Sequence, residues 1–195
     1  MPRIPLPDPP ADVAAPALAD ASQRRALLAR AHDAGVPRSY GRSRSLRQVA
    51  EARALAFIGF DIYQRPQWLA PPAARAWFAM RHAAARGMVE LQAVSAFRSV
   101  EYQVGLIERK IARGLTMDEI LAVSAAPGYS EHHSGRALDI TTPGFAVLEE
   151  EFEASPAFAW LSRHAGDHGF RLSFPRGNPH GIAYEPWHWC WHRRA

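Results

Sequence analysis

The sequence predicts an α+β fold in which helices flank a small, mostly antiparallel sheet. Three observations support this class. The 195 residues are enough for one hydrophobic core. Segments with helical and with strand periodicity are mixed, and they do not follow the regular βαβ order of a doubly wound sheet. No internal repeat is present. We therefore expect one compact unit.

The N-terminal third of the chain predicts an arm followed by a helical extension. Residues 1–21 are rich in proline and alanine and predict an extended, loosely held arm. Residues 22–68 are interpreted as the extension. Its predicted elements are a helix capped by Ser22 and running to His32, a loop over residues 38–45, a helix from Leu46 to Ala56 and a strand from Phe57 to Ile62.

Residues 69–195 are interpreted as the main domain, which the extension joins in one compact unit. Proline at the first turn and glycine after the last turn delimit its first helix, and a Thr-x-x-Glu capping box opens a short one. Its predicted elements are a helix from Pro71 to Gly87, a strand from Met88 to Ser95, a helix from Val100 to Arg113, a short helix at Thr116–Glu119, a strand from Ala137 to Ile140, a helix starting at Ser155, and strands over Phe170–Phe174 and Tyr184–Trp191.

Composition excludes several classes of protein. No run approaches the roughly 20 apolar residues that span a bilayer, so we expect no integral membrane segment. Prolines, Asp8 and Asp12 interrupt the N-terminus, and no export signal is visible. The net charge of +4 comes from scattered arginines, with Lys110 the only lysine, and does not predict nucleic-acid binding. A single cysteine, Cys190, excludes an internal disulfide.

Two short segments concentrate histidines and carboxylates. They are Ser130–Asp139 and Glu185–His188, about fifty residues apart. A catalytic zinc takes three such ligands and keeps one position open, so the two segments together are able to supply a site. In a strand, His188, Cys190 and His192 also share one face, which is a second ligand set. Spacing alone equally fits histidines that cap carbonyl groups at the surface.

Three segments resemble one known family. Ser130–Asp139 matches the SxHxxGxAxD motif of the VanY-like zinc D-alanyl-D-alanine carboxypeptidases, and Glu185–His188 resembles their E-P-W-H. Ser95–Ser99, with Gln103 five residues after the arginine, is similar to their S-G-Y-R-S…Q segment. The three segments follow the family order, and the resemblance covers about residues 69–192. It implies the Hedgehog/DD-peptidase fold.

The resemblance also implies a role for each matched residue. His132, Asp139 and His188 are implied as the ligands of one zinc ion per chain, and Glu185 as the catalytic base. Arg98 is implied to bind either a substrate carboxylate or the developing oxyanion. Gln103 and Ser130 are implied to contact the terminal carboxylate of the substrate. His133 is the neighbour of a ligand, and Gly135 allows a tight backbone between two ligands.

The chain departs from the family at Cys190, which stands where family members usually have an arginine. We interpret Cys190 as a small buried thiol rather than a zinc ligand. Phe97 and Ala96 replace a tyrosine and a glycine, which are milder changes.

The implied activity is zinc-dependent release of a C-terminal D-alanine from peptidoglycan stem peptides, by D,D- or L,D-cleavage. The alternatives are a peptidoglycan endopeptidase and a non-catalytic zinc- or wall-binding module, although a module of that kind would be expected to lack the base or a ligand. We expect a monomer with no nucleic-acid partner. The substrate implies the cell envelope or periplasm; the lack of a visible signal leaves the cytoplasm as the alternative.

Overall fold

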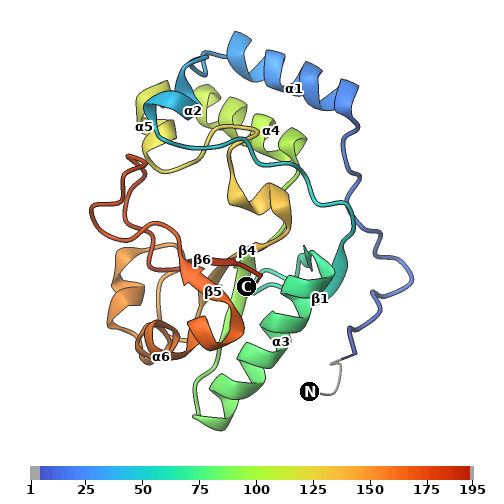
Figure 1. The fold of residues 1–195 in the computed structure, drawn as a ribbon, viewed down its shortest axis with the longest axis vertical. Helices are drawn as coiled ribbons and strands as arrows, with labels where there is room; N and C mark the ends of the chain where they lie inside the picture. Colours follow the sequence, from blue (N-terminus) through green and yellow to red (C-terminus); the bar gives the residue numbers. More distant parts are fainter. Residues whose placement is uncertain (1–4, 194–195) are drawn as a thin grey trace.

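The computed structural model describes residues 5–193, which form two lobes (Figure 1). The sheet lobe contains the four-stranded sheet, a hairpin and two longer helices. Its elements are β1 (Ala56–Phe60), β2 (Pro66–Leu69), α3 (Pro71–Arg86), β3 (Gln92–Ser95), β4 (Ala137–Thr141), α6 (Pro156–His164), β5 (Phe170–Leu172), β6 (His188–Trp191) and the 3₁₀ turns Glu150–Ala154 and Ala165–His168. The helical lobe contains α1 (Ala21–Asp33), α2 (Tyr40–Ser43), α4 (Val100–Ala112) and α5 (Met117–Ala122).

The central sheet has the strand order β3-β4-β6-β5, and every neighbouring pair is antiparallel. This confirms the predicted α+β class. All five residues of β4 are buried, as expected for a central strand that is covered on both faces. In the register of β4, Asp139 lies opposite His188 on β6 and opposite Ser95 on β3. The sheet therefore brings together all three sequence segments that carry polar candidates.

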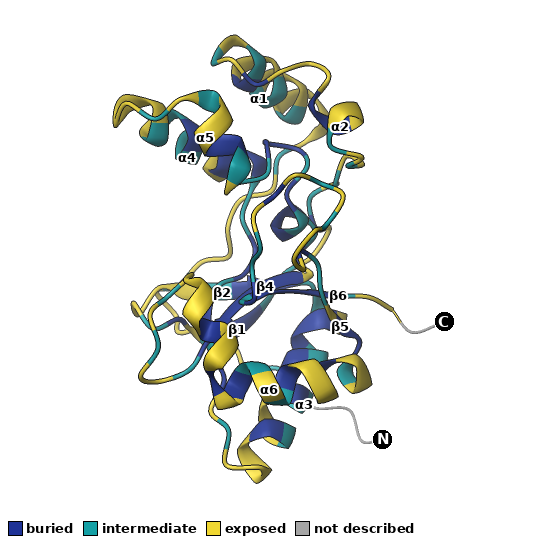
Figure 2. Cartoon of the chain, turned by 90° about the vertical axis from the view of Figure 1, so that its left-hand side faces the viewer, coloured by how far each residue is buried: buried dark blue, intermediate teal, exposed yellow. Residues whose placement is uncertain are grey.

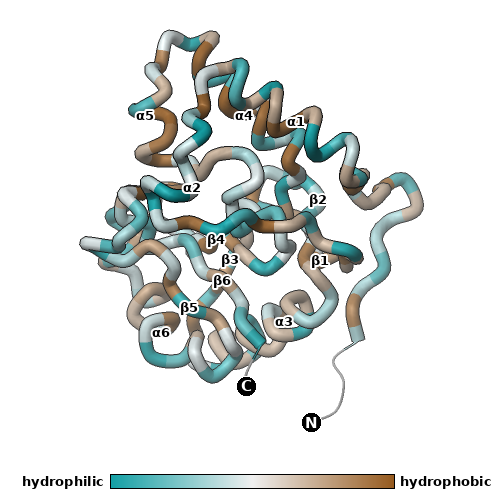
Figure 3. The backbone as a smooth tube through the Cα atoms, turned by 45° about the horizontal axis from the view of Figure 1, so that its top comes forward, coloured by the Kyte–Doolittle hydropathy of each residue, from teal (hydrophilic) through white to brown (hydrophobic). Residues whose placement is uncertain are grey.

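Each lobe has its own hydrophobic core (Figure 2). The core of the sheet lobe includes the fully buried Trp77 and Met80 of α3, packed against Leu138 and Ile140 of β4. In the helical lobe, Ile107 of α4 packs in a second cluster with residues of α1 and α5. Hydrophobic segments, brown in Figure 3, accordingly occur in α4 and α5 as well as in the sheet lobe.

Helix ends follow the local chemistry of the sequence. Pro71 opens α3 and Gly87 follows its last turn, as predicted. The side chain of Ser99 accepts the Tyr102 N–H and caps α4. The capping box of α5 is also confirmed, because Thr116 and Glu119 bond reciprocally.

Three predictions for residues 22–56 are wrong. Helix α1 is capped by Asp20 rather than Ser22, and the predicted loop 38–45 contains α2. The segment Leu46–Ala56 is not a helix. It crosses the molecule in an irregular extended form, where Val49 N–H donates to Gly128 and Ala52 N–H donates to His133. These long-range backbone bonds outweigh the helical propensity of its alanines and leucine.

The predicted strands exist, and all but β4 are shorter than predicted. The predicted strand from Met88 begins only at Gln92, and the one from Tyr184 begins only at His188. Strand β6 ends at Trp191, so His192 lies beyond the strand that would align it with His188. The sequence prediction also missed β2, whose first residue is a proline.

The N-terminal arm, from residue 5 onward, lies against the body of the protein. Leu6 packs against the sheet-lobe core, and Val13 packs against a third cluster around Phe57 and Trp68. The Ala19 N–H donates to Glu51 over 2.8 Å. Within residues 5–193, no helix is both long enough and apolar enough to cross a bilayer. The predicted division at residues 21 and 68 stays a prediction.

Candidate active site

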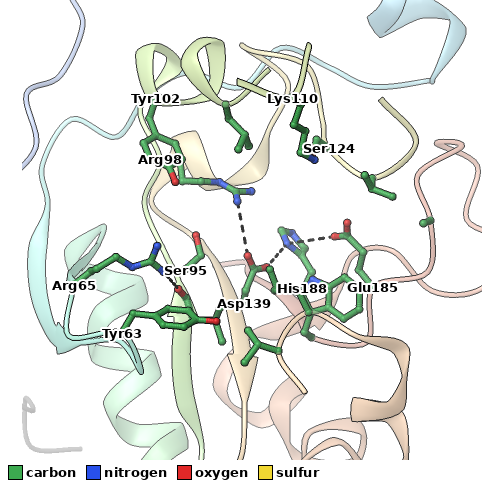
Figure 4. A pocket seen from close by; sticks show the side chains of 17 residues that line it. Tyr63, Arg65, Ser95, Arg98, Tyr102, Lys110, Ser124, Asp139, Glu185 and His188 are labelled. Atoms are coloured by element: carbon green, nitrogen blue, oxygen red, sulfur yellow. Dashed lines mark hydrogen bonds and ion pairs between the residues drawn. The ribbon is translucent and has the colours of Figure 1, made fainter. Parts of the chain in front are cut away.

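Three buried side chains, His132, Asp139 and His188, converge where the two lobes meet. Figure 4 shows two of them, Asp139 and His188, at the cavity. His132 comes from the 3₁₀ turn Glu131–Ser134, Asp139 from β4 and His188 from β6. One donor atom of each lies within 4.8 Å of the others, an arrangement that is able to hold a metal ion. These are the three ligands that the family resemblance implies.

The backbone around Gly135 brings His132 close to Asp139. Gly135 ends the 3₁₀ turn in the left-handed conformation, with φ of +63°. A Cβ atom there would lie 2.8 Å from the Ala70 nitrogen, so a larger residue does not fit. The expected tight backbone between the two donors is therefore confirmed.

The imidazole of His132 is oriented as a metal ligand. Its Nδ1 lies 2.5 Å from the Ala96 carbonyl oxygen, which only accepts, so the ring proton is on Nδ1. The unprotonated Nε2 then faces the Asp139 carboxylate at 3.3 Å and has no hydrogen-bond donor. Two buried acceptors that face one another without a proton are unfavourable. A cation between them removes this conflict, so the residues present fit a metal ion.

His188 is held between two carboxylates. Its Nδ1 lies 3.0 Å from Asp139 Oδ1, and its Nε2 lies 2.9 Å from Glu131 Oε2. When Nε2–H donates to Glu131, the lone pair of Nδ1 is directed to the same space as His132 Nε2. A carboxylate bonded to the far nitrogen of a ligating histidine fixes the tautomer of the ring and makes it a better donor.

The cluster carries more negative charge than its histidines balance. Burial opposes ionisation of Asp139, but His132 and His188 outweigh this effect and hold its pKa below the usual range. Burial also disfavours a charged His188, yet Asp139 and Glu131 raise its pKa to about 10. Burial and the charge of Arg98 lower the pKa of His132 to about 4, which keeps it neutral. The site therefore stabilises one positive charge among its carboxylates.

A tight turn positions Glu185 beside His188. The His188 N–H donates to the Glu185 carbonyl over 3.1 Å, with Pro186 at the position of the turn that proline favours. Trp189 Nε1 donates to the Pro186 carbonyl and pins this turn. As a result, Glu185 Oε2 lies 3.8 Å from His188 Nδ1. Burial raises the pKa of Glu185 to about 7, in the range that suits a general base at neutral pH.

Arg98 lies on the other side of Asp139. Its Nη1 is 4.0 Å from Asp139 Oδ2, and three quarters of its side chain is buried. Its backbone is fixed on both sides, because its N–H donates to the His132 carbonyl and its carbonyl accepts from His133 Nδ1. The guanidinium is thus held at the edge of the metal-binding cluster.

A cavity of about 440 Å³ is lined by Arg98, Asp139, Glu185 and His188, and both lobes contribute to its wall. The hairpin between β1 and β2 presents Tyr63 and Arg65 to it. Asp61, which is almost fully buried, accepts both of their backbone N–H groups and the Arg65 Nε. Arg65 also donates to the Val94 carbonyl and stacks over the Tyr63 ring. The hairpin therefore supplies a rigid cationic edge.

Helix α4 forms the opposite wall. Tyr102, Leu106 and Lys110 recur every four residues and line the cavity together with Val123 and Ser124. Gln103 does not line the cavity: it is fully buried, and its Nε2 donates to the Ala125 carbonyl over 2.8 Å.

Ser130 and His133 of the matched motif, and Cys190 beyond the motifs, lie outside the cavity wall. Ser130 is buried and precedes the 3₁₀ turn. Its implied contact with substrate, like that of Gln103, stays a prediction. His133 donates from Nδ1 to Arg98 and accepts from the Gly128 N–H at Nε2, so it joins two segments of backbone. Cys190 is buried, and burial together with nearby Glu131 raises the pKa of its thiol, which therefore keeps its proton.

The sequence prediction missed four residues at the site: Glu131, Tyr63, Arg65 and Lys110. Glu131 sits inside the motif but contacts a residue 57 positions away, which spacing does not reveal. The signal for Lys110 was visible, because it is the only lysine and follows Tyr102 and Leu106 at helical spacing. Nothing in the sequence indicated that Tyr63 and Arg65 turn toward the cavity.

Known proteins are similar to this chain in sequence and in fold. The family model for VanY, D-alanyl-D-alanine carboxypeptidase, matches residues 66–194. The putative carboxypeptidase YodJ of Bacillus subtilis is 34% identical over 136 residues, which are 67% of this chain and 49% of YodJ. A D-alanyl-D-alanine carboxypeptidase of Enterococcus faecium is 40% identical over 63 residues, which are 31% of this chain and 19% of that protein.

Among solved structures, the LdcB LD-carboxypeptidase superposes with a TM-score of 0.65 and 29% identity, covering 72% of this chain and 69% of that one. The chain spans about half the length of YodJ and less of the enterococcal protein. The match of the family model over most of the chain nevertheless includes every segment that builds the cluster of His132, Asp139 and His188. The chain belongs to the VanY family of D-alanyl-D-alanine carboxypeptidases.

Proposed function

We propose that the protein is a zinc-dependent carboxypeptidase that releases the terminal D-alanine of peptidoglycan stem peptides. One observation carries the proposal: three buried donors surround a space that favours a cation, next to a buried carboxylate and a guanidinium. Two imidazoles and one carboxylate are a typical donor set of catalytic zinc, which keeps a further position open for water or substrate. Zinc would replace the proton that the raised pKa of His188 otherwise keeps on this ring. The names of the relatives supply the substrate class.

In this proposal, His132, Asp139 and His188 hold the zinc ion. When bound, zinc polarises a carbonyl group and acidifies water. Glu185 takes the proton of the attacking water on its carboxylate and delivers it to the nitrogen of the departing D-alanine. Because burial keeps its pKa close to 7, Glu185 both accepts and returns this proton at neutral pH. Arg98 stabilises negative charge that develops on the carbonyl oxygen.

The remainder of the stem peptide has a surface to bind. A smaller groove lined by Pro16, Trp68 and Phe97 adjoins the cavity and shares Arg65, Ser95, Arg98 and Tyr102 with it. A peptide that enters the cavity with its C-terminus is able to continue along this groove. D,D- and L,D-cleavage place the same groups around the scissile bond, so both remain within the proposal.

The test combines metal analysis with two peptides. Purified protein is expected to contain about one equivalent of zinc by mass spectrometry. Incubation with stem pentapeptide is expected to release one alanine if the enzyme is D,D-specific, and incubation with tetrapeptide if it is L,D-specific. Protein that binds zinc but cleaves neither peptide, and instead cuts cross-linked peptidoglycan, would assign the endopeptidase alternative. Protein that binds no zinc would overturn the proposal.

A further inference from the structure

The only lysine of the chain lies in the wall of the cavity rather than on the open surface. Lys110 is on the last turn of α4, is half-buried and donates from Nζ to Ser124 Oγ over 2.8 Å. Burial, and then the nearby charge of Arg98, lower its pKa. Although every other basic side chain apart from the histidines is an arginine, the cavity wall contains a compact ammonium group close to the guanidinium of Arg98.

Within the described residues 5–193, the hydrogen-bond partner of Lys110 is Ser124, and Lys110 forms no ion pair. An ammonium group has three donors, and partial burial next to another cation is costly unless an anion compensates the charge. At least one donor of Lys110 is therefore available to an anionic ligand. By contrast, Arg30 and Arg176 each form an ion pair with a carboxylate.

The surroundings of Lys110 define the size and polarity of that ligand. Leu106 and Val123 line the same part of the cavity and are apolar, as is Ala183 from the loop before β6. Figure 4 shows Lys110 and Ser124 across the cavity from Asp139 and His188, with Glu185 on the same side as His188. A ligand that spans this space meets the metal-binding cluster at one end and an ammonium, a hydroxyl and small apolar side chains at the other.

We propose that Lys110, assisted by Ser124, binds the free C-terminal carboxylate of the substrate, while Leu106, Val123 and Ala183 contact the small side chain of the leaving residue. This inference rests on the proposed function, which it deepens by naming the group that recognises a free chain end. It also separates two roles that the sequence left open for Arg98. Because Arg98 lies 4.0 Å from Asp139, it is placed for the developing oxyanion, and Lys110 takes the carboxylate. This assignment replaces the one that the resemblance implies for Gln103 and Ser130, which are buried and do not line the cavity.

Binding to a catalytically inactive protein tests the inference without depending on turnover. Zinc-loaded Glu185→Gln protein is titrated by calorimetry with the stem pentapeptide and with its C-terminal amide, and likewise with the tetrapeptide and its amide. For whichever of the two peptides the wild-type enzyme cleaves, the free acid is expected to bind at least about tenfold more tightly than the amide. Charge-assisted hydrogen bonds to a carboxylate are strong enough for this difference. Adding Lys110→Met is expected to abolish this difference, and adding Lys110→Arg is expected to retain part of it.

Arg113→Met is the matched control, because it removes an exposed positive charge just after the same helix and outside the cavity. It is expected to leave the ratio of acid to amide binding unchanged. In the Glu185-containing enzyme, Lys110→Met is expected to raise KM for the accepted peptide by about tenfold, with a smaller change in kcat and full zinc content.

The results separate failure of the inference from failure of the proposed function. Equal binding of acid and amide by the parent protein, or an acid preference that survives Lys110→Met, overturns the role of Lys110 even if alanine is released. If the wild-type enzyme cleaves neither peptide while the acid preference depends on Lys110, the proposed reaction fails and the carboxylate site stands.

Discussion

The sheet lobe and the helical lobe contribute different chemistry to the same cavity. The sheet lobe provides Asp139 and His188 from paired strands, with Glu185 from the turn that leads into β6. The helical lobe provides Tyr102, Leu106 and Lys110 from one face of α4. Asp139 and His188, two of the three candidate metal ligands, lie on paired strands, and the hydrogen bonds between the strands fix their separation. Groups that face a substrate extend from a helix as longer, separate side chains.

This comparison suggests that metal binding depends on the sheet lobe and substrate preference on the helical lobe. The segment between them couples the two. Arg98 donates from its backbone to His132, and His133 donates back to Arg98, so the start of α4 is held to the 3₁₀ turn. Variants in each lobe should therefore separate metal affinity, catalysis and stability.

The largest effect is expected for Asp139→Asn, which removes the charged donor at the centre of the cluster. The amide is a poor zinc ligand, and its NH₂ group would face the imidazoles. Zinc content is expected to fall from about one equivalent to nearly none, and alanine release to background. Thermal unfolding of both metal-free proteins serves as the control for folding. One full equivalent of zinc in the variant would contradict the assignment of Asp139.

Glu185→Gln is expected to separate catalysis from metal binding within the sheet lobe. The amide keeps the shape of the side chain but cannot take a proton, so kcat is expected to fall by about 10²- to 10⁴-fold. Zinc content should remain at one equivalent, because Glu185 is not one of the three donors. The measurement is alanine release under saturating peptide, together with metal analysis of the same sample. Unchanged kcat would show that another group acts as the base.

Glu131→Gln tests whether the carboxylate behind His188 supports the metal. Loss of the charged partner at Nε2 is expected to weaken zinc affinity by about 10- to 100-fold, as replacing such partners does in other zinc sites. Competition with a chromophoric chelator measures this directly. The matched control is Glu90→Gln, at an exposed position next to Gln92 and away from the cavity. Equal affinities for both variants and the wild type would rule out a supporting role for Glu131.

The smallest effect is expected for Ile107→Val, in the core of the helical lobe. Loss of one buried methylene should cost about 0.5–1.5 kcal/mol of unfolding free energy. Ile140→Val, equally buried and next to Asp139, is the matched change in the sheet lobe. The two variants should unfold at similar denaturant concentrations, but only Ile140→Val should also weaken zinc affinity. Equal loss of zinc affinity in both would mean that the lobes do not act separately.

The parts of the fold that local chemistry determines were predictable. The capped helices α3, α4 and α5 and the central strand β4 appear close to where their sequence signals place them. The segment Leu46–Ala56 was not predictable, because its structure depends on backbone partners at Gly128 and His133. Local propensity does not contain that information.

The candidate site was also predictable only where its residues lie within short sequence motifs. The three donors and Glu185 lie in motifs that a resemblance identifies, and the structure brings them together. The contact between Glu131 and His188, and the approach of the Tyr63 hairpin, arise only from the folded chain. Lys110 was predictable in part. The sequence shows that it is the only lysine, but only the position of α4 in the folded chain shows that its side chain faces the cavity.

The wall formed by Tyr102, Leu106 and Lys110 has a consequence for how such proteins diversify. Three side chains one turn apart on a single helix are exchangeable without altering the strand pairing that carries Asp139 and His188. Substitutions on this face would therefore change which chain ends are accepted while the reactive centre is inherited intact. The same property makes α4 the natural place to retarget the protein by design, with the sheet lobe kept as an invariant scaffold.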